Sequence, residues 1–467
     1  SIGTLNVDGD ITLSAGSSYA VEVNRNGEAD LLAVDGAVTI DQGAMVHVSA
    51  EHGTDTGFYY APSTAYTILT ADSGITGTFG GVTDSFAFLD SALDYRTPNQ
   101  VILVLERNLT SLADVAVTEN QRNVAIAVSS LNTSNSNDVV NAVLGLSEDD
   151  ARSAYHTLSG EIHPSVDGLL IQNSSIGRHA VNNRIRSAFD GVAANEEQAV
   201  ALDRSDETSE TGRPMGWFEG YGHWSEISDT DNTAAIDSQT AGFVTGADID
   251  TLRGWRTGLF GGYGTTSLTI DERESSGDVG SFLLGAYAGY QLNEFDFRFG
   301  ASNAWHNVTI NRDVTIGSFS DEVSADYAAI TLEAFGEVGY THTTRFARLE
   351  PFSGLALINQ RTQDFVEEGD AAALRANSAS QAVGVFSLGS RFERQLQSFG
   401  SGATLLNGSL GWRHAFGDVD PAKTMRFDDD AVFAIEGAPV EQDTFLVDVG
   451  LRHEIDGVFF DAGYHSA

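Results

Sequence analysis

The adjacent pair Asn182–Asn183 has the residue types for one chemical reaction. The side-chain amide of an asparagine can attack its own main-chain carbonyl carbon, which closes a succinimide and cuts the chain. Carboxylates whose protonation is shifted by burial can assist such a reaction by orienting the amide or a water molecule. Because Asn-Asn pairs are common, the pair is also compatible with an ordinary helix, and its interpretation depends on the elements around it.

The segment around this pair is locally basic, although the protein carries a formal net charge of −41 at pH 7. Arg178, Arg184 and Arg186 lie in a stretch of about residues 166–190 whose apolar residues recur at helical spacing, which predicts one helix. These arginines either pair with acids elsewhere in the chain or lie on a solvated helix face. The negative charge of the whole chain argues against nucleic acid as a partner, because phosphates would be repelled.

Other catalytic and ligand-binding motifs are absent from the sequence. It contains no GxSxG, no HExxH, no glycine-rich phosphate loop and no Cys. His163 and His179 are not at ligand spacing, so packing or lining an interior is the better interpretation for both. Asp8, Asp10 and Asp35 fall in Asp-Gly and Gly-Asp pairs that suggest turns rather than a calcium repeat. We therefore expect no metal and no cofactor.

Two regions precede the longest part of the chain. Residues 1 to about 108 alternate short apolar runs with glycine turns at a spacing close to 20 residues, which predicts a parallel β-solenoid, with a β-sandwich as the alternative. Residues 109 to about 197 have Ala, Leu and Val at helical spacing, which predicts a helical linker. Residues 198–214 are polar and are predicted to form a loop.

From residue 215 onward, strand-length segments alternate between an apolar face and a face of glycine and charge. Phe282, Leu284 and Tyr290 share one face of a segment in which Gly285 and Gln291 share the other. Long strands, aromatic strand ends, and tight turns alternating with long polar loops favour a membrane barrel over a soluble sandwich. The sequence contains no run of 18 apolar residues, so it predicts no transmembrane helix. We count about eleven strands, and because single-chain bacterial barrels use an even number, a further strand is expected after Ala467.

Several longer segments follow one another in a recognisable order. These are "YTILTADSGITGTF" with "LDYRTPNQVILVLERN", then "YHTLSGEIHPSVDGLL", then "LEPFSGLALINQRTQDFVEEGDAAAL", "GSLGWRHAFGD" and "FAIEGAPVEQDTFLVDVGLRHEI". They resemble, in that order, a pertactin-like passenger end, a linker and consecutive barrel strands of type Va autotransporters. The resemblance covers essentially the whole chain. It departs at "FFDAGYHSA", where family members continue into a closing strand that ends on an aromatic residue.

This resemblance implies a mainly β protein. Its first implied part is a right-handed parallel β-helix stem at 1–108, with an autochaperone-like region at about 60–108. A helical linker at 109–197 follows, of which about 166–190 lies inside the barrel. The last implied parts are a polar loop at 198–214 and a 12-stranded antiparallel transmembrane β-barrel at 215–467. A signal peptide and a larger passenger are expected upstream of Ser1. The implied function is an outer-membrane translocator that secretes and anchors its own N-terminal passenger by type V secretion, with the linker helix plugging the pore.

Partners and location follow from the same resemblance. The implied partners are the barrel-assembly machinery, periplasmic chaperones, outer-membrane lipid and lipopolysaccharide, and the protein's own passenger, and a monomer is expected. The barrel would lie in the bacterial outer membrane and the stem on the cell surface, after transit through the periplasm. Acids on the lumen face would then balance the basic linker helix. These acids are Asp296, Glu333, Glu337, Asp448 and Glu454.

The resemblance also bears on the asparagine pair. "AVNNRIRSAFD" is similar to the cleavage helix of the large secreted serine-protease autotransporters, and "GEVGY" and "EFDFRF" place Glu337 and Asp296 at matching positions. It therefore implies self-cleavage between Asn182 and Asn183 that releases the passenger, with Asp296 and Glu337 as helper acids. The protein would then be an enzyme only as a single-turnover catalyst on its own linker. An adhesin stalk that is never released is an alternative, and a diffusion porin is disfavoured because it needs neither stem nor linker helix.

Overall fold

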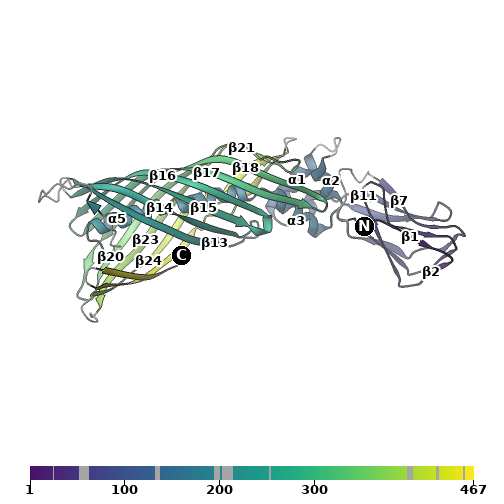
Figure 1. Ribbon diagram of the computed structural model, residues 1–467, viewed down its shortest axis with the longest axis horizontal. Coiled ribbons are helices and arrows are strands. Elements are labelled where there is room, and N and C mark those ends of the chain that lie inside the picture. The colour runs from purple at the N-terminus through teal and green to yellow at the C-terminus, as the bar shows by residue number, and fades with distance from the viewer. Residues whose placement is uncertain are drawn as a thin grey trace.

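The computed structural model is mainly β, with a helical segment between two β regions (Figure 1). The structure describes residues 1–24, 26–51, 63–131, 137–193, 200–201, 214–251, 254–396, 403–427, 431–455 and 458–466. A stem of short strands lies at one end of the molecule, and a curled sheet of long strands forms the rest (Figure 1). The end of this sheet that faces the stem is called the stem end, and the opposite one the far end.

Nine short strands build most of the stem. They are β1 Thr4–Val7, β2 Ile11–Leu13, β3 Ser18–Val23, β4 Leu31–Val34, β5 Val38–Ile40, β6 Met45–Ala50, β7 Ser63–Ala71, β8 Ile75–Gly77 and β9 Gly81–Asp84. Consecutive strands belong to three different sheets, and each strand pairs in parallel with the one three places later. Thr4 pairs with Leu31, and Leu32 with Leu69, so successive coils are 27 and 37 residues long. The predicted spacing of about 20 residues is wrong, because glycines mark turns within a three-stranded coil and not the ends of coils.

Aspartates tie the coils of the stem together. Asp35 Oδ1 accepts a hydrogen bond from Gly9 N at 2.8 Å, and Asp10 Oδ1 accepts one from Ala37 N at 2.7 Å. Gly9 has a φ of 101°, a conformation that favours glycine. Asp10 and Asp35 thus act between neighbouring coils, and the turn role predicted for them stays a prediction.

The stack of coils ends in an antiparallel hairpin. The hairpin consists of β10 Leu89–Asp94 and β11 Gln100–Arg107, and β11 also pairs antiparallel with β7. Parallel pairing between coils therefore stops at this hairpin, on the side of the stem that faces the helices.

The described residues of the helical segment form one 3-10 turn and five helices. They are η1 Leu112–Val115, α1 Glu119–Ser130, α2 Asp138–Leu144, α3 Glu148–Leu158, α4 Ile162–Asn173 and α5 Ser175–Ala188. The single helix predicted over 166–190 is two helices, which meet at Ser174. The Ser174 hydroxyl donates to Ile171 O at 2.7 Å, a bond from side chain to main chain that bends helices. None of the described helices has both the length and the apolar character needed to cross a membrane.

The long strands form one antiparallel sheet in chain order. They are β13 Pro214–Ile227, β14 Ile236–Thr251, β15 Trp255–Ile270, β16 Ser275–Leu292, β17 Phe295–Ile316, β18 Phe319–Tyr340, β20 Arg348–Thr362, β23 Ala379–Leu396, β24 Ala403–Gly417, β27 Asp443–Ile455 and β28 Val458–Ser466, with short β12 Val200–Ala201 and β19 His342–Thr343 at their sides and the 3-10 turn η3 Asp271–Arg273 between β15 and β16. None of the described pairings joins β28 to β12 or β13, so a closed twelve-stranded barrel stays a prediction. Of the predicted polar loop at 198–214, residues 198–199 and 202–213 lie outside the described residues, whereas Val200–Ala201 form β12 and Pro214 begins β13.

Two long connections at the stem end form a second sheet that the sequence did not predict. Its strands are β21 Phe365–Val366, β22 Arg375–Ala376, β25 Ala422–Arg426 and β26 Val432–Glu436, in that order. This cap sheet packs on α4 and α1 through Phe365, Met425 and Ile435, which share one core with those helices.

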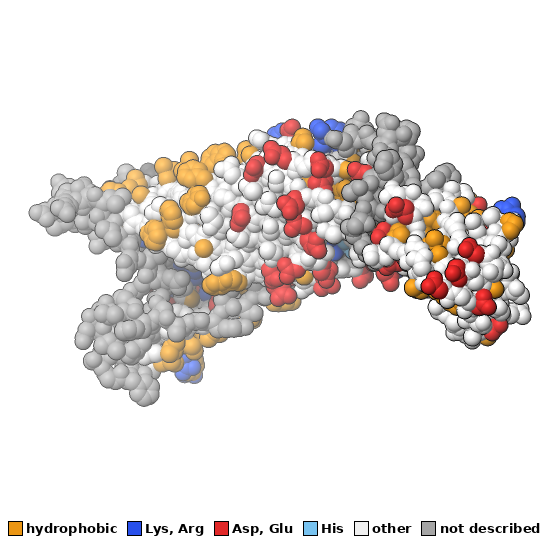
Figure 2. All heavy atoms as spheres, turned by 45° about the vertical axis from the view of Figure 1, so that its right-hand side comes forward, with side chains coloured by type: hydrophobic (Ala, Val, Ile, Leu, Met, Phe, Trp, Pro, Cys, Tyr) orange, Lys and Arg blue, Asp and Glu red, His pale blue; other side chains and the backbone are white. Residues whose placement is uncertain are grey.

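The inner face of the long sheet differs between its two ends. Toward the stem it is apolar, and residues such as Val308 and Ile310 pack on Val166, Leu169 and Leu170 of α4. Toward the far end it carries glycine and charge, as the alternating pattern predicts. The outer face has the opposite trend (Figure 2): exposed apolar side chains gather toward the far end, and acids gather toward the stem. The apolar set includes Leu259, Phe282, Leu284, Leu332 and Leu388, and the acidic set includes Asp278, Asp313, Glu322 and Asp326.

A neutral histidine joins α1 to α3. Gln121 Nε2 donates to His156 Nε2 at 2.8 Å, while Gln121 Oε1 accepts from Val117 N at 2.8 Å. The histidine nitrogen must therefore be unprotonated. Burial, aided by the positive charge of Arg273, lowers the pKa of His156 to about 4.

Acidification is expected to loosen the contact between α1 and α3. Because the pKa of His156 is lower in the folded protein than its ordinary value of about 6.5, its stabilising contribution is complete above about pH 6.5 and is lost as the pH falls toward 4. Hydrogen–deuterium exchange of α1 should accelerate over that range, beyond the intrinsic pH effect, in the wild type. It should change less in His156→Gln, and an equal acceleration in both proteins would contradict the assignment.

Candidate functional site

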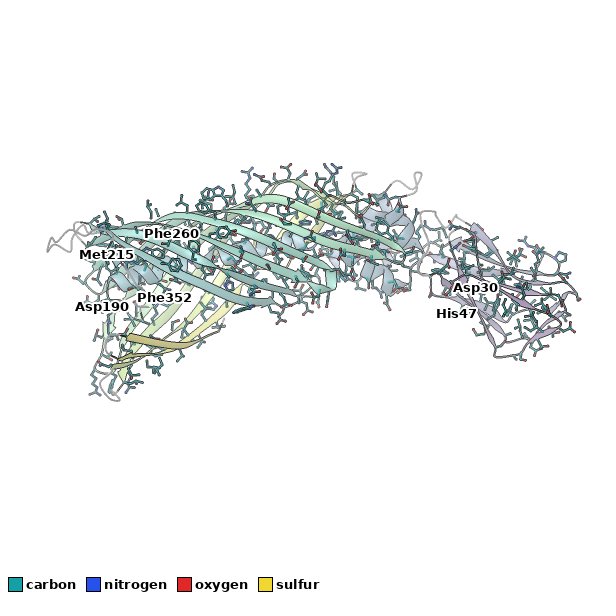
Figure 3. The ribbon with its side chains drawn as sticks, viewed as in Figure 1. Asp30, His47, Asp190, Met215, Phe260 and Phe352 are labelled. Carbon is teal, nitrogen blue, oxygen red and sulfur yellow. The ribbon has the colours of Figure 1, made fainter. Side chains whose placement is uncertain are left out.

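The candidate site is the interior of the long sheet, along α5. Figure 3 places Asp190, just after α5, and Met215, at the start of the sheet wall, at the far end, while Asp30 and His47 lie in the stem. The apolar side of α5, with Ala180, Val181 and Ile185, packs on wall residues that include Trp217 and Phe260. Gly289 makes this approach possible, because a Cβ there would lie 2.5 Å from Ile185 Cγ2.

Arg184 of α5 is held by a buried aspartate of the wall. Its Nε donates to Asp248 Oδ2 at 2.6 Å and its Nη2 to Asp248 Oδ1 at 3.0 Å. Arg256 Nε also donates to Asp248 Oδ1 at 2.8 Å, and the Tyr287 hydroxyl donates to Oδ2 at 2.6 Å. Asp248 is only 2% exposed, so all its counter-charges come from the protein. The sequence analysis missed this acid, although the alternation along β14 puts it on the same face as Gly246.

The other two arginines of α5 have different surroundings. Arg178 forms an ion pair with Glu333 of β18, one of the acids expected on the inner face. Arg186 instead donates to the main-chain oxygens of Val192 and Ala193, at 3.4 and 3.2 Å, and to Asn183 Oδ1. Within the described part of the chain no carboxylate lies at ion-pair distance from Arg186. Its guanidinium therefore closes the turn that follows α5, where main-chain carbonyls lack helical partners.

Glu337 belongs to a closed ring of charges on neighbouring strands. Arg298 Nη1 donates to Glu337 Oε1 at 2.6 Å and to Glu350 Oε1 at 2.9 Å. Arg391 Nη1 donates to Glu350 Oε1 at 2.8 Å, and its Nη2 donates to Glu337 Oε2 at 3.0 Å. Both oxygens of Glu337 are thus engaged. Asp296 lies beside this ring, 3.6 Å from Arg298 Nη2.

Asn182 and Asn183 border a cavity of about 410 Å³ between α5 and the wall. Glu337 and Asp448 line the same cavity, as do Arg178, Arg186 and His179. Asn182 Oδ1 is buried and has no hydrogen-bond partner among the described residues. Asp448 accepts from Ser409 Oγ at 2.5 Å.

The other predicted acids lie elsewhere. Asp296 lines a separate cavity of about 480 Å³ at the far end, next to Phe189 and Asp190. The side chain of Glu454 lies outside the described residues. The structure therefore brings Glu337 and Asp448 to the asparagine pair but puts Asp296 in another cavity. Within the described residues, no group of three or more His, Asp or Glu side chains is arranged to hold a metal ion.

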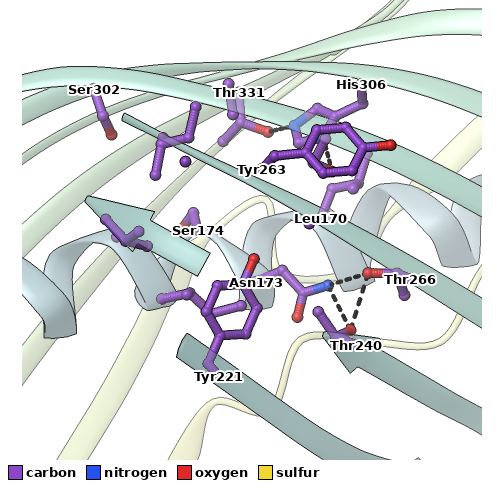
Figure 4. Close-up of a pocket in the computed structure, with 18 of the residues that line it drawn as sticks. Leu170, Asn173, Ser174, Tyr221, Thr240, Tyr263, Thr266, Ser302, His306 and Thr331 are labelled. Carbon is purple, nitrogen blue, oxygen red and sulfur yellow. Dashed lines mark hydrogen bonds between the residues drawn. The ribbon is translucent and has the colours of Figure 1, made fainter. Parts of the chain in front are cut away.

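A small cavity lined by both polar and apolar side chains marks the junction of α4 and α5 (Figure 4). Asn173 Nδ2 donates to Thr266 Oγ1 at 3.3 Å and to Thr240 Oγ1 at 3.5 Å, and His306 Nε2 lies 2.9 Å from Thr331 Oγ1. Its volume of about 60 Å³ suits a few water molecules bound to hydroxyl groups. The junction is therefore held to the wall by neutral hydrogen bonds, between the apolar stem end and the charged far end.

Polar contacts also fix α4 at the stem end. His163 Nε2 lies 2.8 Å from Glu367 Oε1, and the His163 ring packs at 4.3 Å from that of Phe365. Burial alone would raise the pKa of Glu367, but Arg312 and His163 outweigh it and hold the pKa at about 2. Lys423 Nζ pairs with Asp167 at 3.0 Å in equally buried surroundings. His163 thus has the packing role expected from the sequence.

A comparison of the sequence with protein-family models identifies one family. Residues 216–465 match the sequence model of the autotransporter β-domain. Two extracellular serine proteases of Serratia marcescens are 30% and 28% identical to this chain over 501 and 508 residues. These alignments cover 97% and 99% of this chain but 46% and 47% of those proteins, so the chain spans about half the length of the curated relatives it matches.

Solved structures include one of similar type. The translocator domain of the autotransporter NalP from Neisseria meningitidis is 14% identical, with a TM-score of 0.42 over 63% of this chain and 92% of that one. The family expected from the sequence motifs is confirmed by the sequence comparisons.

Replacing Asp248 should destabilise the helix-filled sheet strongly. Asp248→Ala leaves two arginines and a tyrosine hydroxyl buried without their acceptor, and losing one partner of a buried ion pair costs about 3–5 kcal/mol. The urea concentration that unfolds the protein in detergent, followed by its heat-modifiable migration on gels, should fall accordingly. Asp237→Ala changes an exposed acid of the same strand and serves as the control. Equal midpoints for the two variants would show that Asp248 is not the main anchor of α5.

Proposed function

Because the chain belongs to the autotransporter family, we propose that it is an outer-membrane translocator that secretes and anchors its own N-terminal passenger, with α4 and α5 plugging the pore. One observation carries this proposal. The chain runs from the stem, through the interior of its own sheet along α4 and α5, to the far end, and then returns as wall strand β13 (Figure 1). A polypeptide exported through the barrel would be left in this threaded arrangement.

The distribution of side chains on the outer surface of the sheet supports one orientation of the protein in the membrane. Exposed apolar side chains toward the far end suit the lipid-facing band of an outer-membrane barrel (Figure 2). The acids of the stem end suit water and the polar headgroups of lipopolysaccharide. We therefore place the far end at the periplasm and the stem on the cell surface.

The contacts inside the sheet support the proposal that α4 and α5 plug the pore. The three arginines of α5 bond to Asp248, to Glu333 and to main-chain carbonyls, and α4 is packed in an apolar core with inward residues of the sheet. Buried pairs of this kind are strongly disrupted by loss of either partner. A helix held in this way leaves a cavity of about 410 Å³ beside it, but not a continuous passage where the apolar core fills the stem end.

The stem supports the identification of a passenger end. We infer that its three-stranded parallel coils are the last coils of a right-handed parallel β-helix, and that the region at about 60–108, which contains the closing hairpin β10–β11, is the folding template. The passenger would emerge with its C-terminal end first. Each new coil would then dock on the one already folded, which disfavours backsliding without any nucleotide.

Membrane insertion requires helpers that the chain does not contain. We propose the barrel-assembly machinery and periplasmic chaperones as partners during assembly, and outer-membrane lipid and lipopolysaccharide as the surroundings of the finished monomer.

Tagging the two ends of the sheet tests this topology. An epitope placed before Ser1 should be labelled by antibody on intact Gram-negative cells, because it lies at the stem. An epitope inserted between Asn293 and Glu294, in the far-end turn that joins β16 to β17, should be labelled only after lysis. The matched insertions use the same antibody and the same cells. The reverse pattern, or labelling of neither tag after proven expression, would refute a surface-displayed passenger.

A second candidate function is release of the passenger by self-cleavage. It is favoured by the buried, unbonded Oδ1 of Asn182 at a cavity that Glu337 also lines. The side-chain nitrogen of Asn182 would attack the main-chain carbonyl carbon of the same residue. The main-chain nitrogen of Asn183 would take up the proton and leave as an amine, and a succinimide would remain at the new C-terminus. Glu337 would act within its arginine ring as an orienting anion, and Asp296, from the neighbouring cavity, as a more distant helper acid.

Mass spectrometry decides between anchoring and release. If self-cleavage occurs, membranes from cells expressing the protein should yield fragments that end at Asn182 and begin at Asn183, and Asn182→Ala should stay whole. Asn173→Ala, which changes an asparagine of the α4–α5 junction, is the matched control and should still be cut. If the wild type remains a single chain, the anchored form is the functional one.

A further inference from the structure

The edge of the cap sheet is covered by a helix. β26 is the last strand in the order β21–β22–β25–β26, so one of its edges has no strand partner among the described residues. Asn120 Oδ1 accepts from Glu436 N at 3.0 Å, and Asn120 Nδ2 donates to Glu436 O at 2.8 Å. Asn123 Nδ2 donates to Ala434 O at 2.9 Å. Two amide side chains of α1 thus replace a fifth strand and satisfy an edge that would otherwise be open.

The spacing of these residues explains the fit. Asn120 and Asn123 are three residues apart and therefore lie on one face of a helix. Ala434 and Glu436 are two residues apart, so their main-chain groups point to the same edge of β26. The amide of Asn120 has one donor and one acceptor in the arrangement of a peptide group, which lets it pair twice with Glu436.

Asn120 also bonds to the loop between β13 and β14. Asn120 N donates to Asn232 Oδ1 at 2.8 Å, and Asn120 Nδ2 donates to Asn232 O at 3.2 Å. Asn232 Nδ2 in turn donates to Glu436 Oε2 at 2.9 Å. Asn120 is 1% exposed, so water cannot replace these partners. One buried side chain therefore connects α1 to both the barrel wall and the cap sheet.

Apolar contacts join the base of the stem to the same assembly. Val124 and Val128 of α1 share a core with Phe88 of the stem, Tyr155 of α3 and Ile435 of β26. Ala87 N in the stem donates to Leu146 O, between α2 and α3, at 2.9 Å. The stem base and α1 thus form one surface, and the opposing surface belongs to residues that follow α1 in the chain.

We propose that α1 and the stem stay bound to the barrel after the chain between α1 and α2 is cut, so that a non-covalent clasp anchors the passenger in addition to the polypeptide. The clasp consists of Asn120 and Asn123 on one side and of Asn232, Ala434 and Glu436 on the other, supported by the apolar core around Val124. Its ligand is this chain's own segment 81–131. The inference goes beyond secretion and covalent anchoring, because it makes the passenger's retention independent of an unbroken chain.

Cutting the chain on the cell surface tests the clasp. A specific protease site is inserted between Leu131 and Asn137, an epitope is placed before Ser1, and intact cells that display the protein are digested and sedimented. Denaturing gels report how much chain is cut, and the epitope reports where the N-terminal fragment is. The clasp predicts that most of the cut fragment sediments with the cells. Appearance of the fragment in the supernatant in proportion to cutting would overturn it.

Variants of the clasp separate it from a general loss of folding. Asn120→Ala removes the double pairing with Glu436 and the side-chain bond to Asn232 O, but it keeps the main-chain bond from Asn120 N to Asn232 Oδ1. It should speed release of the cut fragment by roughly tenfold or more. Asn123→Ala removes one bond, should display normally and should speed release by a smaller factor, so it carries the test if Asn120→Ala is not displayed. Ile126→Ala changes an exposed residue of the same helix and should release at the wild-type rate. Equal release from Asn123→Ala and Ile126→Ala would overturn the role of the clasp.

Before digestion, all variants report display of the passenger independently of the clasp. Loss of surface epitope from uncut cells would therefore indicate a failure of secretion, whereas normal display followed by complete shedding would indicate a failure of the clasp alone.

Discussion

Cations buried inside a sheet whose outside is apolar must find their counter-charges on the inner wall. Arg184 meets this constraint with Asp248, which it shares with Arg256 and Tyr287, and Arg178 meets it with Glu333. These contacts fix both the depth and the rotation of α5, because a shift by one helical turn would separate every pair. The position of α4, the placement of the asparagine pair beside its cavity and the direction in which the stem leaves the sheet all depend on that registration.

The interior is divided into two chemical zones, and each holds the chain in a different way. The far end has ion pairs and cavities of about 410 and 480 Å³ around a helix that carries arginine. The stem end has an apolar core that includes Val166, Leu169, Ile310 and the cap sheet, and it encloses buried ion pairs such as that of Asp167 and Lys423. A charged lining suits passage of a hydrated polypeptide, whereas an apolar core suits a permanent closure. A single long strand can line both zones, because its inward residues are charged or small along the half toward the far end and apolar along the half toward the stem.

Alternation along single strands was enough to predict the long sheet, because each inward position is set by its own neighbours in sequence. The contacts between segments could not be predicted in this way. Asp248 was missed as the partner of Arg184 because nothing local to β14 indicates which helix residue it faces. The cap sheet was missed because β21 and β22 have two residues each and depend on β25 and β26, about 50 residues later, for their order. The coil length was misjudged because glycine turns are more frequent than coils, and only pairing such as that of Thr4 with Leu31 separates the two.

The hairpin β10–β11 gives the stem a fixed base. Its strand β11 runs antiparallel to β7, so parallel stacking stops at this point and proceeds only away from the sheet. The described strands of the coils further out pair only with strands of other coils. Evolution is therefore free to lengthen, shorten or exchange the outer coils without repacking the base, the clasp or the membrane-embedded wall. If the chain exports its passenger as proposed, the same base can carry unrelated outer domains, and those domains can diversify without a matching change in the sheet.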